Sequence, residues 1–312
     1  MKHYDAISAI DDLPKWVSDA RKIKANQRSL SFMGEGKTIC LLFFNNSLRT
    51  RLSTQKAAMN LGMEVMVMNF GSEGWQLEFE DGAIMNEGKS EHIKEAAEVV
   101  SQFCDIVAIR AFASLSDKEK DEAEVVLNGF KKHASIPVVN MESSVGHPLQ
   151  ALADAITIDE QDVAKKPKVV LSWAPHPKAL PHAVANSFVE MMQRQDADFV
   201  ITHPEGYELN SEITKDVTIE YDQEKACENA DFIYVKNWSS YSDYGKVLSQ
   251  NPEWMMTKKK LGQAKFMHCL PVRRNVVVED AVLDSEQSLV IEQANNRTFA
   301  AQIVLKNILE NL

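Results

Sequence analysis

Short apolar segments alternate with helix-forming stretches along most of this chain. A short apolar run bounded by polar residues is typical of a buried strand. Strands that alternate with helices favour parallel sheets covered by helices on both faces. The pattern predicts strands at 39–44, 64–68, 106–109, 136–141, 168–173, 199–202, 217–221, 231–235, 265–267 and 289–291. It predicts helices at 51–61, 91–103, 120–132, 149–158, 182–194, 223–229 and 299–310. The fold class expected from this alternation is α/β.

A chain of 312 residues is long for one hydrophobic core, so we expect two domains. The pair His147-Pro148 opens a predicted helix, because proline is favoured at the first helical position. We therefore predict a first domain at 1–148 and a second at 149–296. The last segment, 297–312, has the pattern of an amphipathic helix, and we expect it to return to the first domain.

The composition of the chain disfavours several classes of binding partner. The formal net charge is −11, which disfavours non-specific binding to nucleic acid. No apolar run reaches membrane-spanning length, and the first residues lack the apolar core of a signal peptide, so we expect no membrane partner. The four cysteines lie far apart without metal-ligand spacing, which predicts no metal site. Free thiols in a chain of this length fit a reducing compartment, and we expect a cytoplasmic protein.

Two hydroxyls and two guanidinium groups gather in the segment Ser47-Leu48-Arg49-Thr50-Arg51, between a predicted strand and a predicted helix. The start of a helix exposes unpaired backbone N–H groups and carries positive dipole charge. Arginine grips phosphate through two parallel hydrogen bonds. The segment therefore predicts a phosphate site, with a capped helix and solvated arginines as the alternative.

Polar residues also follow other predicted strands, where an α/β sheet places its ligands, at the carboxyl ends of the strands. These residues are Arg110, Glu142, His176, Lys236 and the pair His268-Cys269. Because they follow strands of both predicted domains, we expect a ligand-binding cleft between the domains.

Three motifs together resemble the aspartate/ornithine carbamoyltransferase family. Ser47–Arg51 resembles its Ser-x-Arg-Thr motif, His147-Pro148-Leu149-Gln150 its His-Pro-x-Gln motif, and His268-Cys269-Leu270-Pro271 the His-Cys-Leu-Pro of the ornithine branch. The motifs occur in the family's order, and the resemblance covers essentially the whole chain. It implies two Rossmann-like domains, a knotted segment in the second domain near Lys236 to Trp254, and no metal or organic cofactor.

The resemblance implies transfer of a carbamoyl group from carbamoyl phosphate to a δ-amine. It is strongest to members that act on N-succinyl-L-ornithine, which implies N-succinyl-L-citrulline and phosphate as products, in arginine biosynthesis. The Asp…Ser-Met-Gly segment that ornithine enzymes use for a free α-amino group is missing here. N-acetylornithine or ornithine as acceptor stays an alternative, as does a non-catalytic carbamoyl phosphate-binding protein. A dinucleotide-dependent oxidoreductase is disfavoured, because no Gly-x-Gly-x-x-Gly follows a predicted strand.

The resemblance also implies which residues touch carbamoyl phosphate. On the phosphate it places Ser47, Leu48, Arg49 and Thr50. Near the carbonyl oxygen it places Thr50, Arg110 and His147, with Arg297 supplying further positive charge. The carbamoyl NH2 is expected to donate to Gln150 and to the backbone carbonyls of Cys269 and Leu270. The residues implied to act in catalysis are Thr50, Arg110, His147 and Cys269.

For the second substrate the resemblance implies Glu142, His176, Lys236, Arg273 and Ser90. Acetylornithine enzymes carry glutamate where this chain has Ser90. A carboxylate there would repel a succinyl carboxylate, so Ser90 favours the succinyl substrate. The long loop 71–90 contains Trp75, which the family places over carbamoyl phosphate in the neighbouring subunit's site. This implies a homotrimer with shared active sites.

Overall fold

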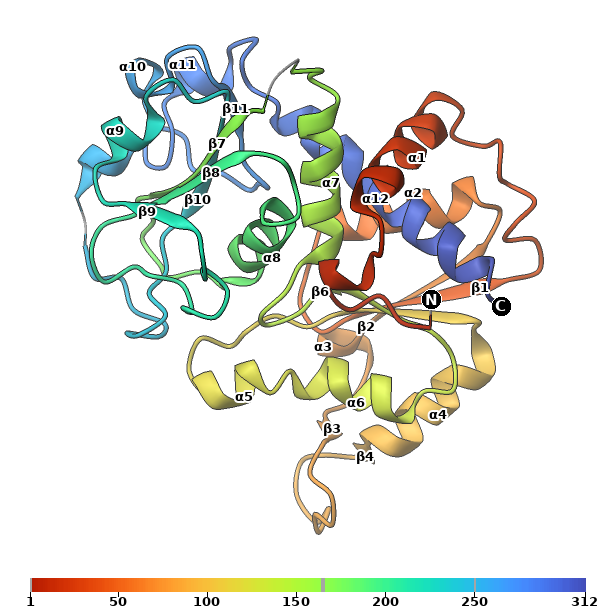
Figure 1. Ribbon diagram of the computed structural model, residues 1–312. Helices are drawn as coiled ribbons and strands as arrows, with labels where there is room; N and C mark the ends of the chain where they lie inside the picture. Colours follow the sequence, from red (N-terminus) through yellow and green to blue (C-terminus); the bar gives the residue numbers. More distant parts are fainter. Residues whose placement is uncertain (1, 164–165, 250) are drawn as a thin grey trace. The chain divides into compact units, whose positions relative to one another are not determined.

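The computed structural model describes residues 2–163, 166–249 and 251–312 (Figure 1). They form two compact units. One contains the residues up to Leu152 together with Arg297–Leu312, and the other is Ala153–Asn296. The division falls inside helix α7 (Pro148–Asp159) and inside helix α12 (Val290–Leu309). The predicted boundary after residue 148 lies at the start of α7.

The first unit is built on a parallel sheet with the strand order β2-β1-β5-β6. The strands are β1 (Thr38–Phe43), β2 (Glu64–Asn69), β5 (Ile106–Arg110) and β6 (Val138–Glu142). Phe43 of β1 is level with Arg110 of β5, and Arg110 is level with Glu142 of β6. The carboxyl ends of these three strands therefore align at one edge of the sheet.

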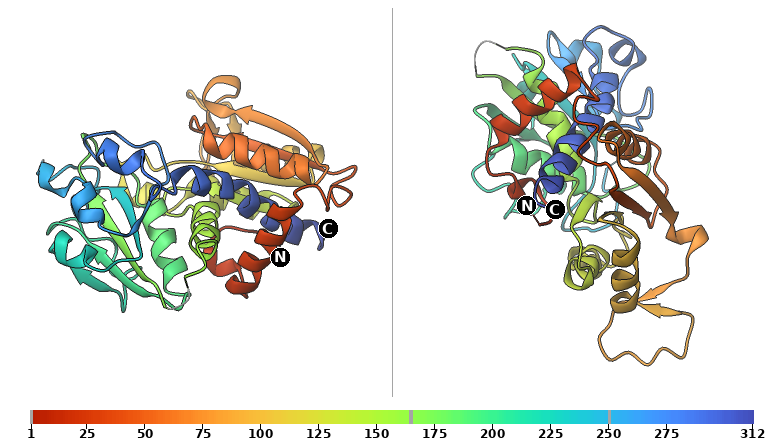
Figure 2. Two further views of the ribbon diagram at one scale, coloured as in Figure 1. Left: turned by 90° about the horizontal axis from the view of Figure 1, so that it is seen from above. Right: turned by 90° about the vertical axis from the view of Figure 1, so that its right-hand side faces the viewer.

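Helices cover both faces of this sheet (Figure 1). Helices α4 (Ile93–Phe103) and α6 (Val125–His133) pack on one face through a core that includes Phe130 and Val107. The other face carries α1 (Leu13–Ala25), α2 (Arg49–Asn60) and the later part of α12 (Figures 1 and 2). Smaller elements of this unit are the 3-10 helix Ile7–Ala9, α3 (Phe70–Glu73), α5 (Lys118–Glu122) and the two-stranded sheet of β3 (Leu77–Glu78) and β4 (Glu91–His92).

The second unit has a five-stranded parallel sheet in the order β11-β10-β7-β8-β9. The strands are β7 (Lys168–Ala174), β8 (Asp198–Thr202), β9 (Thr218–Glu220), β10 (Phe232–Asn237) and β11 (Lys265–Met267). The helices are α8 (Ala183–Met192), α9 (Gln223–Cys227), α10 (Lys258–Leu261), α11 (Asp280–Leu283) and the 3-10 helix Pro252–Trp254.

Side chains of β10 show how these helices are divided between the two faces of the second sheet, because successive residues of a strand point to opposite faces. Ile233 and Val235 pack in a core with residues of α9, α10 and α11. Tyr234 stacks on Phe188 of α8, with ring centroids 4.4 Å apart. The sheet is therefore covered on both faces, and the predicted α/β class with parallel sheets in two units is confirmed.

Two predicted elements are wrong. The strand predicted at 289–291 is the start of α12, and only Ser288 forms an isolated bridge to Phe266. The helix predicted at 120–132 is divided into α5 and α6, because Glu124 has a φ of 46° and breaks the helical backbone. The carboxylate of Asp121 accepts from the backbone N–H groups of Ser114 and Leu115, which fixes the chain before the break.

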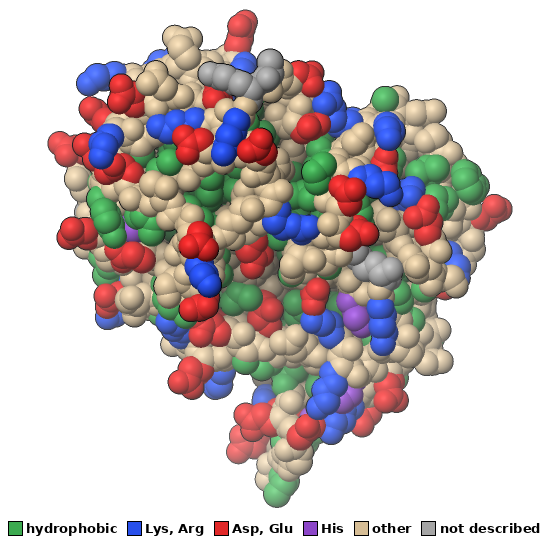
Figure 3. Space-filling model, viewed as in Figure 1, with side chains coloured by type: hydrophobic (Ala, Val, Ile, Leu, Met, Phe, Trp, Pro, Cys, Tyr) green, Lys and Arg blue, Asp and Glu red, His purple; other side chains and the backbone are tan. Residues whose placement is uncertain are grey.

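Other predicted features lie partly outside the described residues. Met1 and 164–165 belong to the predicted domains, and Gln250 belongs to the segment predicted to form a knot. The knot stays a prediction. Among the described residues, no helix combines the length and the apolar character needed to cross a bilayer. Figure 3 shows Lys and Arg side chains interspersed with Asp and Glu on the face in view.

The C-terminal helix α12 joins the first unit from Arg297 onward, as its amphipathic pattern predicts. Gln302 is fully buried and connects two other segments of the unit. Its Oε1 accepts from Asn60 Nδ2 of α2 at 3.0 Å, and its Nε2 donates to the Gln27 carbonyl at 2.7 Å. One side chain thus anchors α12 to α2 and to the segment after α1.

Gln302→Leu should lower the free energy of unfolding by about 2 kcal/mol, because the buried Asn60 amide loses its acceptor. Urea titration followed by tryptophan fluorescence measures the change. Asn311→Leu is the control, since the Asn311 amide is exposed at the end of the chain and its loss should change stability by less than about 0.5 kcal/mol. Equal midpoints for both variants would show that the Gln302 contacts do not stabilise the unit.

Candidate functional site

The turn after β1 leads directly into α2, a helix of 12 residues. Leu48 stands at the cap position, and among the described residues no side-chain hydrogen bond caps this helix. Its first backbone N–H groups are therefore available to an anion. Ser47 and Arg49 are half-buried, Thr50 is buried, and Leu48 is 66% exposed.

A buried guanidinium lies beside this turn. Arg297 of α12 donates from Nη1 to Gln150 Oε1 at 2.7 Å and from Nη2 to Thr50 Oγ1 at 2.5 Å. The same Nη2 lies 3.3 Å from His147 Nε2. All four side chains are at most 5% exposed. Residues from α2, from the start of α7 and from α12 thus form one buried group.

A second buried arginine stands at the end of β5. Arg110 donates from Nε to Glu142 Oε2 at 3.1 Å and from Nη1 to the backbone carbonyls of Asn45 and Asn46 at 3.0 and 2.9 Å. The same Glu142 oxygen lies 3.6 Å from His147 Nε2. Glu142 therefore connects the two arginine-centred groups.

The Arg110 guanidinium also lies over the ring of Phe112, 4.0 Å from its centroid. Burial lowers the pKa of Arg110, the Glu142 carboxylate opposes that change, and the charge of Arg49 adds to it. The side chain remains a cation, because arginine does not deprotonate in proteins. The first unit therefore places Arg110 on the Glu142 carboxylate, Arg49 near enough to Arg110 for its charge to act on it, and Arg297 beside Thr50 in the first turn of α2. This arrangement suits a small dianion that carries a phosphate and a carbonyl oxygen.

The second unit has its own polar group at the carboxyl ends of its strands. His176 follows β7, and its Nε2 accepts from Arg273 Nε at 3.1 Å. The indole of Trp238 donates to the His176 carbonyl at 3.1 Å. Burial and the charges of Arg273, Lys236 and Lys178 lower the pKa of His176, in agreement with a neutral ring that accepts a hydrogen bond.

Lys236 stands near the end of β10 and is only 6% exposed. No hydrogen bond or ion pair to another described residue is found for its ammonium group. Burying a cation without a partner is costly. A carboxylate ligand would relieve that cost, so Lys236 and the nearby Arg273 form a candidate carboxylate site.

Cys269 and Leu270 lie in the turn after β11 and are half-buried. The Leu270 N–H donates to His268 Nδ1 at 2.9 Å, and the backbone of Leu270 has a φ of 56°. The local conformation of this turn is therefore fixed partly by the histidine that precedes it.

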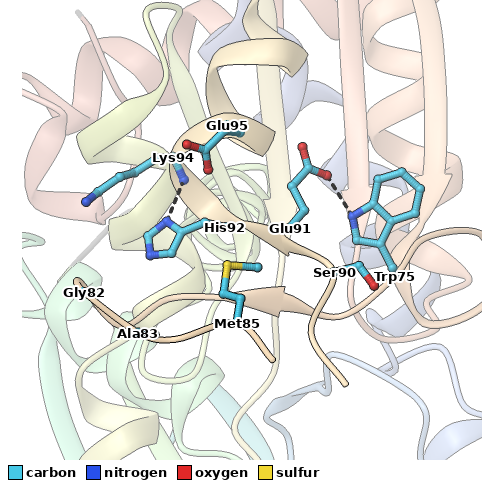
Figure 4. A pocket seen from close by; sticks show the side chains of 9 residues that line it. All are labelled: Trp75, Gly82, Ala83, Met85, Ser90, Glu91, His92, Lys94 and Glu95. Carbon is cyan, nitrogen blue, oxygen red and sulfur yellow. Dashed lines mark hydrogen bonds between the residues drawn. The ribbon is translucent and has the colours of Figure 1, made fainter. Parts of the chain in front are cut away.

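Trp75 and Ser90 line one pocket of about 670 Å³ in the first unit (Figure 4). The Trp75 indole donates to Glu91 Oε2 at 2.7 Å, and its side chain is 56% exposed. Ser90 lies beside this pair, and its backbone N–H donates to the Gln76 carbonyl. Trp75, which is predicted to contact carbamoyl phosphate, and Ser90, which is predicted to contact the second substrate, thus line the same pocket.

The structure brings together six of the predicted residues in the first unit: Thr50, Arg110, Glu142, His147, Gln150 and Arg297. Glu142, which the resemblance gives to the second substrate, is bonded to Arg110 in this group. His176 and Arg273 form a pair in the second unit. Cys269 and Leu270 belong to that unit as well.

Sequence reasoning missed the carbonyls of Asn45 and Asn46 and the ring of Phe112 as partners of Arg110. The Asn-Asn pair marks a turn, but nothing in it indicates that its carbonyls accept from an arginine more than sixty positions away. Among the described residues no group of three His, Cys, Asp or Glu side chains is arranged to hold a metal ion.

Two family models match the chain. The model described as the carbamoyl-P binding domain of aspartate/ornithine carbamoyltransferase matches residues 5–160. The model described as the Asp/Orn binding domain of aspartate/ornithine carbamoyltransferase matches residues 181–308.

The chain is also similar in sequence to individual carbamoyltransferases. The chain is 48% identical to the N-succinylornithine carbamoyltransferase of Bacteroides fragilis (strain 638R), with 100% of both chains covered. It is 34% identical to the N-acetylornithine carbamoyltransferase of Xanthomonas axonopodis pv. citri (strain 306), over 87% of this chain and 86% of that one.

Among solved structures, a similar one is an N-acetyl-L-ornithine transcarbamylase mutant, in which serine replaces a glutamate, complexed with carbamyl phosphate and N-succinyl-L-norvaline. Its TM-score is 0.91 at 31% identity, over 98% of this chain and 99% of that one. Together with the family models and the buried arginine group, these similarities lead to one conclusion. The chain belongs to the aspartate/ornithine carbamoyltransferase family, as its three motifs predict.

Proposed function

We propose that this protein transfers the carbamoyl group of carbamoyl phosphate to the δ-amine of N-succinyl-L-ornithine, giving N-succinyl-L-citrulline and phosphate. The observation that carries the proposal is the buried guanidinium of Arg297, bonded to Thr50 and Gln150 and close to His147. A buried cation beside the unpaired backbone N–H groups at the start of a helix suits a small phosphorylated dianion. The 48% identity to a protein named for this activity supports the same reaction.

The first unit would bind carbamoyl phosphate. Ser47, Leu48, Arg49 and the N–H groups at the start of α2 would hold the phosphate. Thr50, Arg110 and His147 would face the carbonyl oxygen, where negative charge develops as the amine attacks the carbon. Donors fixed in advance stabilise such charge, and the loss of one costs about a hundredfold or more in rate. The family model that matches this part of the chain is described as carbamoyl-P binding, which supports the assignment.

The carbamoyl NH2 would donate to Gln150 Oε1 and to the backbone carbonyls of Cys269 and Leu270. Gln150 Oε1 already accepts from Arg297, and an amide oxygen has a second lone pair for a further donor. This oxygen can therefore bind the arginine and the substrate together. Cys269 would act through its carbonyl, so its thiol need not react.

The second unit would bind the acylated amino acid. N-succinyl-L-ornithine carries two carboxylates, and Lys236 and Arg273 supply two cations beside His176. Because Glu142 is held by Arg110 in the first unit, it would orient that guanidinium and His147 as well as meet the substrate.

The preference for a succinyl group would depend on Ser90. The resemblance matches Ser90 to a glutamate of acetylornithine enzymes, whose charge would repel a second carboxylate. A transcarbamylase mutant with serine in place of glutamate was crystallised with N-succinyl-L-norvaline, which supports this reading of the position. N-acetylornithine and ornithine are the rival acceptors.

The active protein would be a homotrimer in which each loop 71–90 completes the site of a neighbouring subunit. Figure 1 shows the chain between β3 and β4 projecting away from the sheet of the first unit. Ile84 in that segment is 85% exposed and Met85 is 39% exposed. Exposed apolar side chains at the tip of a loop favour contact with a partner. Trp75 would cover carbamoyl phosphate and exclude water from it.

We place the enzyme in the cytoplasm and its reaction in arginine biosynthesis. All four cysteines are free, which fits a reducing compartment. The ureido product carries the nitrogen and carbon that a guanidinium group needs, which suits a step toward arginine.

An assay with four acceptors tests the proposed reaction. The wild-type protein should form a ureido product from carbamoyl phosphate and N-succinylornithine at a kcat/KM at least about a hundredfold above that for N-acetylornithine, ornithine or aspartate. Colorimetric detection of the ureido group measures the product. Saturable binding of carbamoyl phosphate without product from any acceptor would instead identify a binding protein.

Replacing Ser90 by glutamate should reverse the acyl preference. The new carboxylate would repel the succinyl carboxylate, so kcat/KM for N-succinylornithine should fall by about a hundredfold while that for N-acetylornithine rises. Ser90→Gln is the matched control, because it has nearly the same volume without the charge. If both variants keep the wild-type preference, Ser90 does not face the acyl group.

Mixed trimers test whether sites are shared. Trp75→Ala and Arg297→Met should each reduce kcat by about a hundredfold or more when purified alone. Co-expressed with different tags and purified as hybrids, they should recover about a third of the wild-type activity, since each closed trimer that contains both variants has one site in three that pairs an intact Arg297 with a neighbour's intact Trp75.

The control hybrid combines Arg297→Met with Arg110→Met. Both arginines surround Glu142 and His147 of one chain, so no site in this hybrid can contain both. Recovery in the control, or none in the first hybrid, would contradict a site completed by the neighbouring loop.

A further inference from the structure

The turn after β11 has a backbone conformation that its residue types do not favour. Leu270 has a φ of 56°, in the left-handed region that residues with a Cβ rarely adopt. Such a conformation persists where surrounding contacts determine it. The orientation of the Cys269 and Leu270 carbonyls therefore depends on groups outside the turn.

Gln293 of α12 supplies such a contact. Its Oε1 accepts from the backbone N–H of His268 at 2.9 Å, and its Nε2 donates to Asp154 Oδ1 of α7 at 2.7 Å. Gln293 is 1% exposed and Asp154 is fully buried. Since the backbone N–H of His268 can only donate, the amide oxygen must face His268 and the amide nitrogen must face Asp154.

The side chain of His268 then forms a hydrogen bond within the turn after β11. The His268 imidazole accepts the Leu270 N–H on Nδ1 at 2.9 Å. Hydrogen bonds thus run from Asp154 through Gln293 to the backbone of His268, and from the His268 ring to Leu270. Gln293 is the one side chain in this series that joins α12, α7 and the turn of the second unit.

We propose that Gln293 is a positioning residue, which orients the Cys269 and Leu270 carbonyls to accept hydrogen bonds from the NH2 of carbamoyl phosphate. This inference rests on the proposed function. Gln293 touches no reacting atom, and it acts through the His268 backbone. Its loss should weaken recognition of the NH2 group more than recognition of the phosphate.

Asn296 provides a matched control on the same helix. It is also a fully buried amide, and its Nδ2 donates to Thr157 Oγ1 at 2.9 Å and to Glu160 Oε2 at 2.8 Å. Thr157 lies on α7, as Asp154 does, and Glu160 directly follows the last residue of that helix. Gln293→Met and Asn296→Leu therefore each replace a buried amide between the same two helices with an apolar side chain of similar size.

Inhibition by acetyl phosphate distinguishes a positioning role of Gln293 from a general contribution of this residue to the stability of the fold. It has the phosphate and the planar carbonyl of carbamoyl phosphate, with a methyl group in place of the NH2. The measured quantity is the ratio of the inhibition constant of acetyl phosphate to the KM of carbamoyl phosphate, determined with N-succinylornithine at saturation. A general loss of structure would change both constants together and leave the ratio unchanged.

Gln293→Met should lower this ratio by about tenfold, the effect expected for one lost or misaligned hydrogen bond, while Asn296→Leu should leave it within about twofold. If Gln293→Met does not fold, Gln293→Asn, whose amide is one methylene short of His268, should show the same fall. An unchanged ratio, or equal falls in the Gln293 and Asn296 variants, would overturn the inference alone. A wild-type protein that forms no ureido product would overturn the proposed function first, and this inference with it.

Discussion

Burial of the Arg297 guanidinium is the constraint on which the first unit depends. A charge removed from water destabilises a fold unless hydrogen bonds replace the lost hydration. Thr50 and Gln150 supply those bonds, and they stand 247 and 147 positions away in the sequence. The C-terminal helix can therefore place Arg297 only where the turn before α2 and the start of α7 are already adjacent. The same constraint fixes a cation beside the free N–H groups of α2.

Two buried arginines of this unit are held by different kinds of group. Glu142 is bonded to Arg110 and lies near His147, whereas Arg297 donates to the neutral side chains of Thr50 and Gln150. Buried guanidinium groups beside the start of a helix are favourable for a protein that holds a dianion. The formal net charge of the whole chain is −11, so this concentration of positive charge is local. A tightly bound phosphate compound is the ligand that such a charge distribution selects.

The sequence predicts the strands and the residues at their carboxyl ends well, because both follow from local patterns. β1, β5, β7 and β10 lie within one or two residues of their predicted ranges. The errors arise where a long-range contact or a single backbone dihedral angle determines the secondary structure. Leu289 pairs its N–H with Phe266 like a strand residue, yet its carbonyl accepts from Gln293 as the first bond of a helix. The break at Glu124 follows from one left-handed residue within a run of good helix formers.

Residues that support a site are harder to find in a sequence than residues that touch a ligand. The ligand-binding groups stand together in motifs, since a turn after a strand presents neighbouring residues to the same molecule. Gln293, Gln302 and Asn296 stand apart in a helix, and each is defined by a partner more than a hundred positions away. Their amides show no spacing or composition that separates them from solvent-exposed ones. Burial distinguishes them, because a buried amide must satisfy both its donor and its acceptor, and this requirement forces it to join segments that the chain itself does not place together.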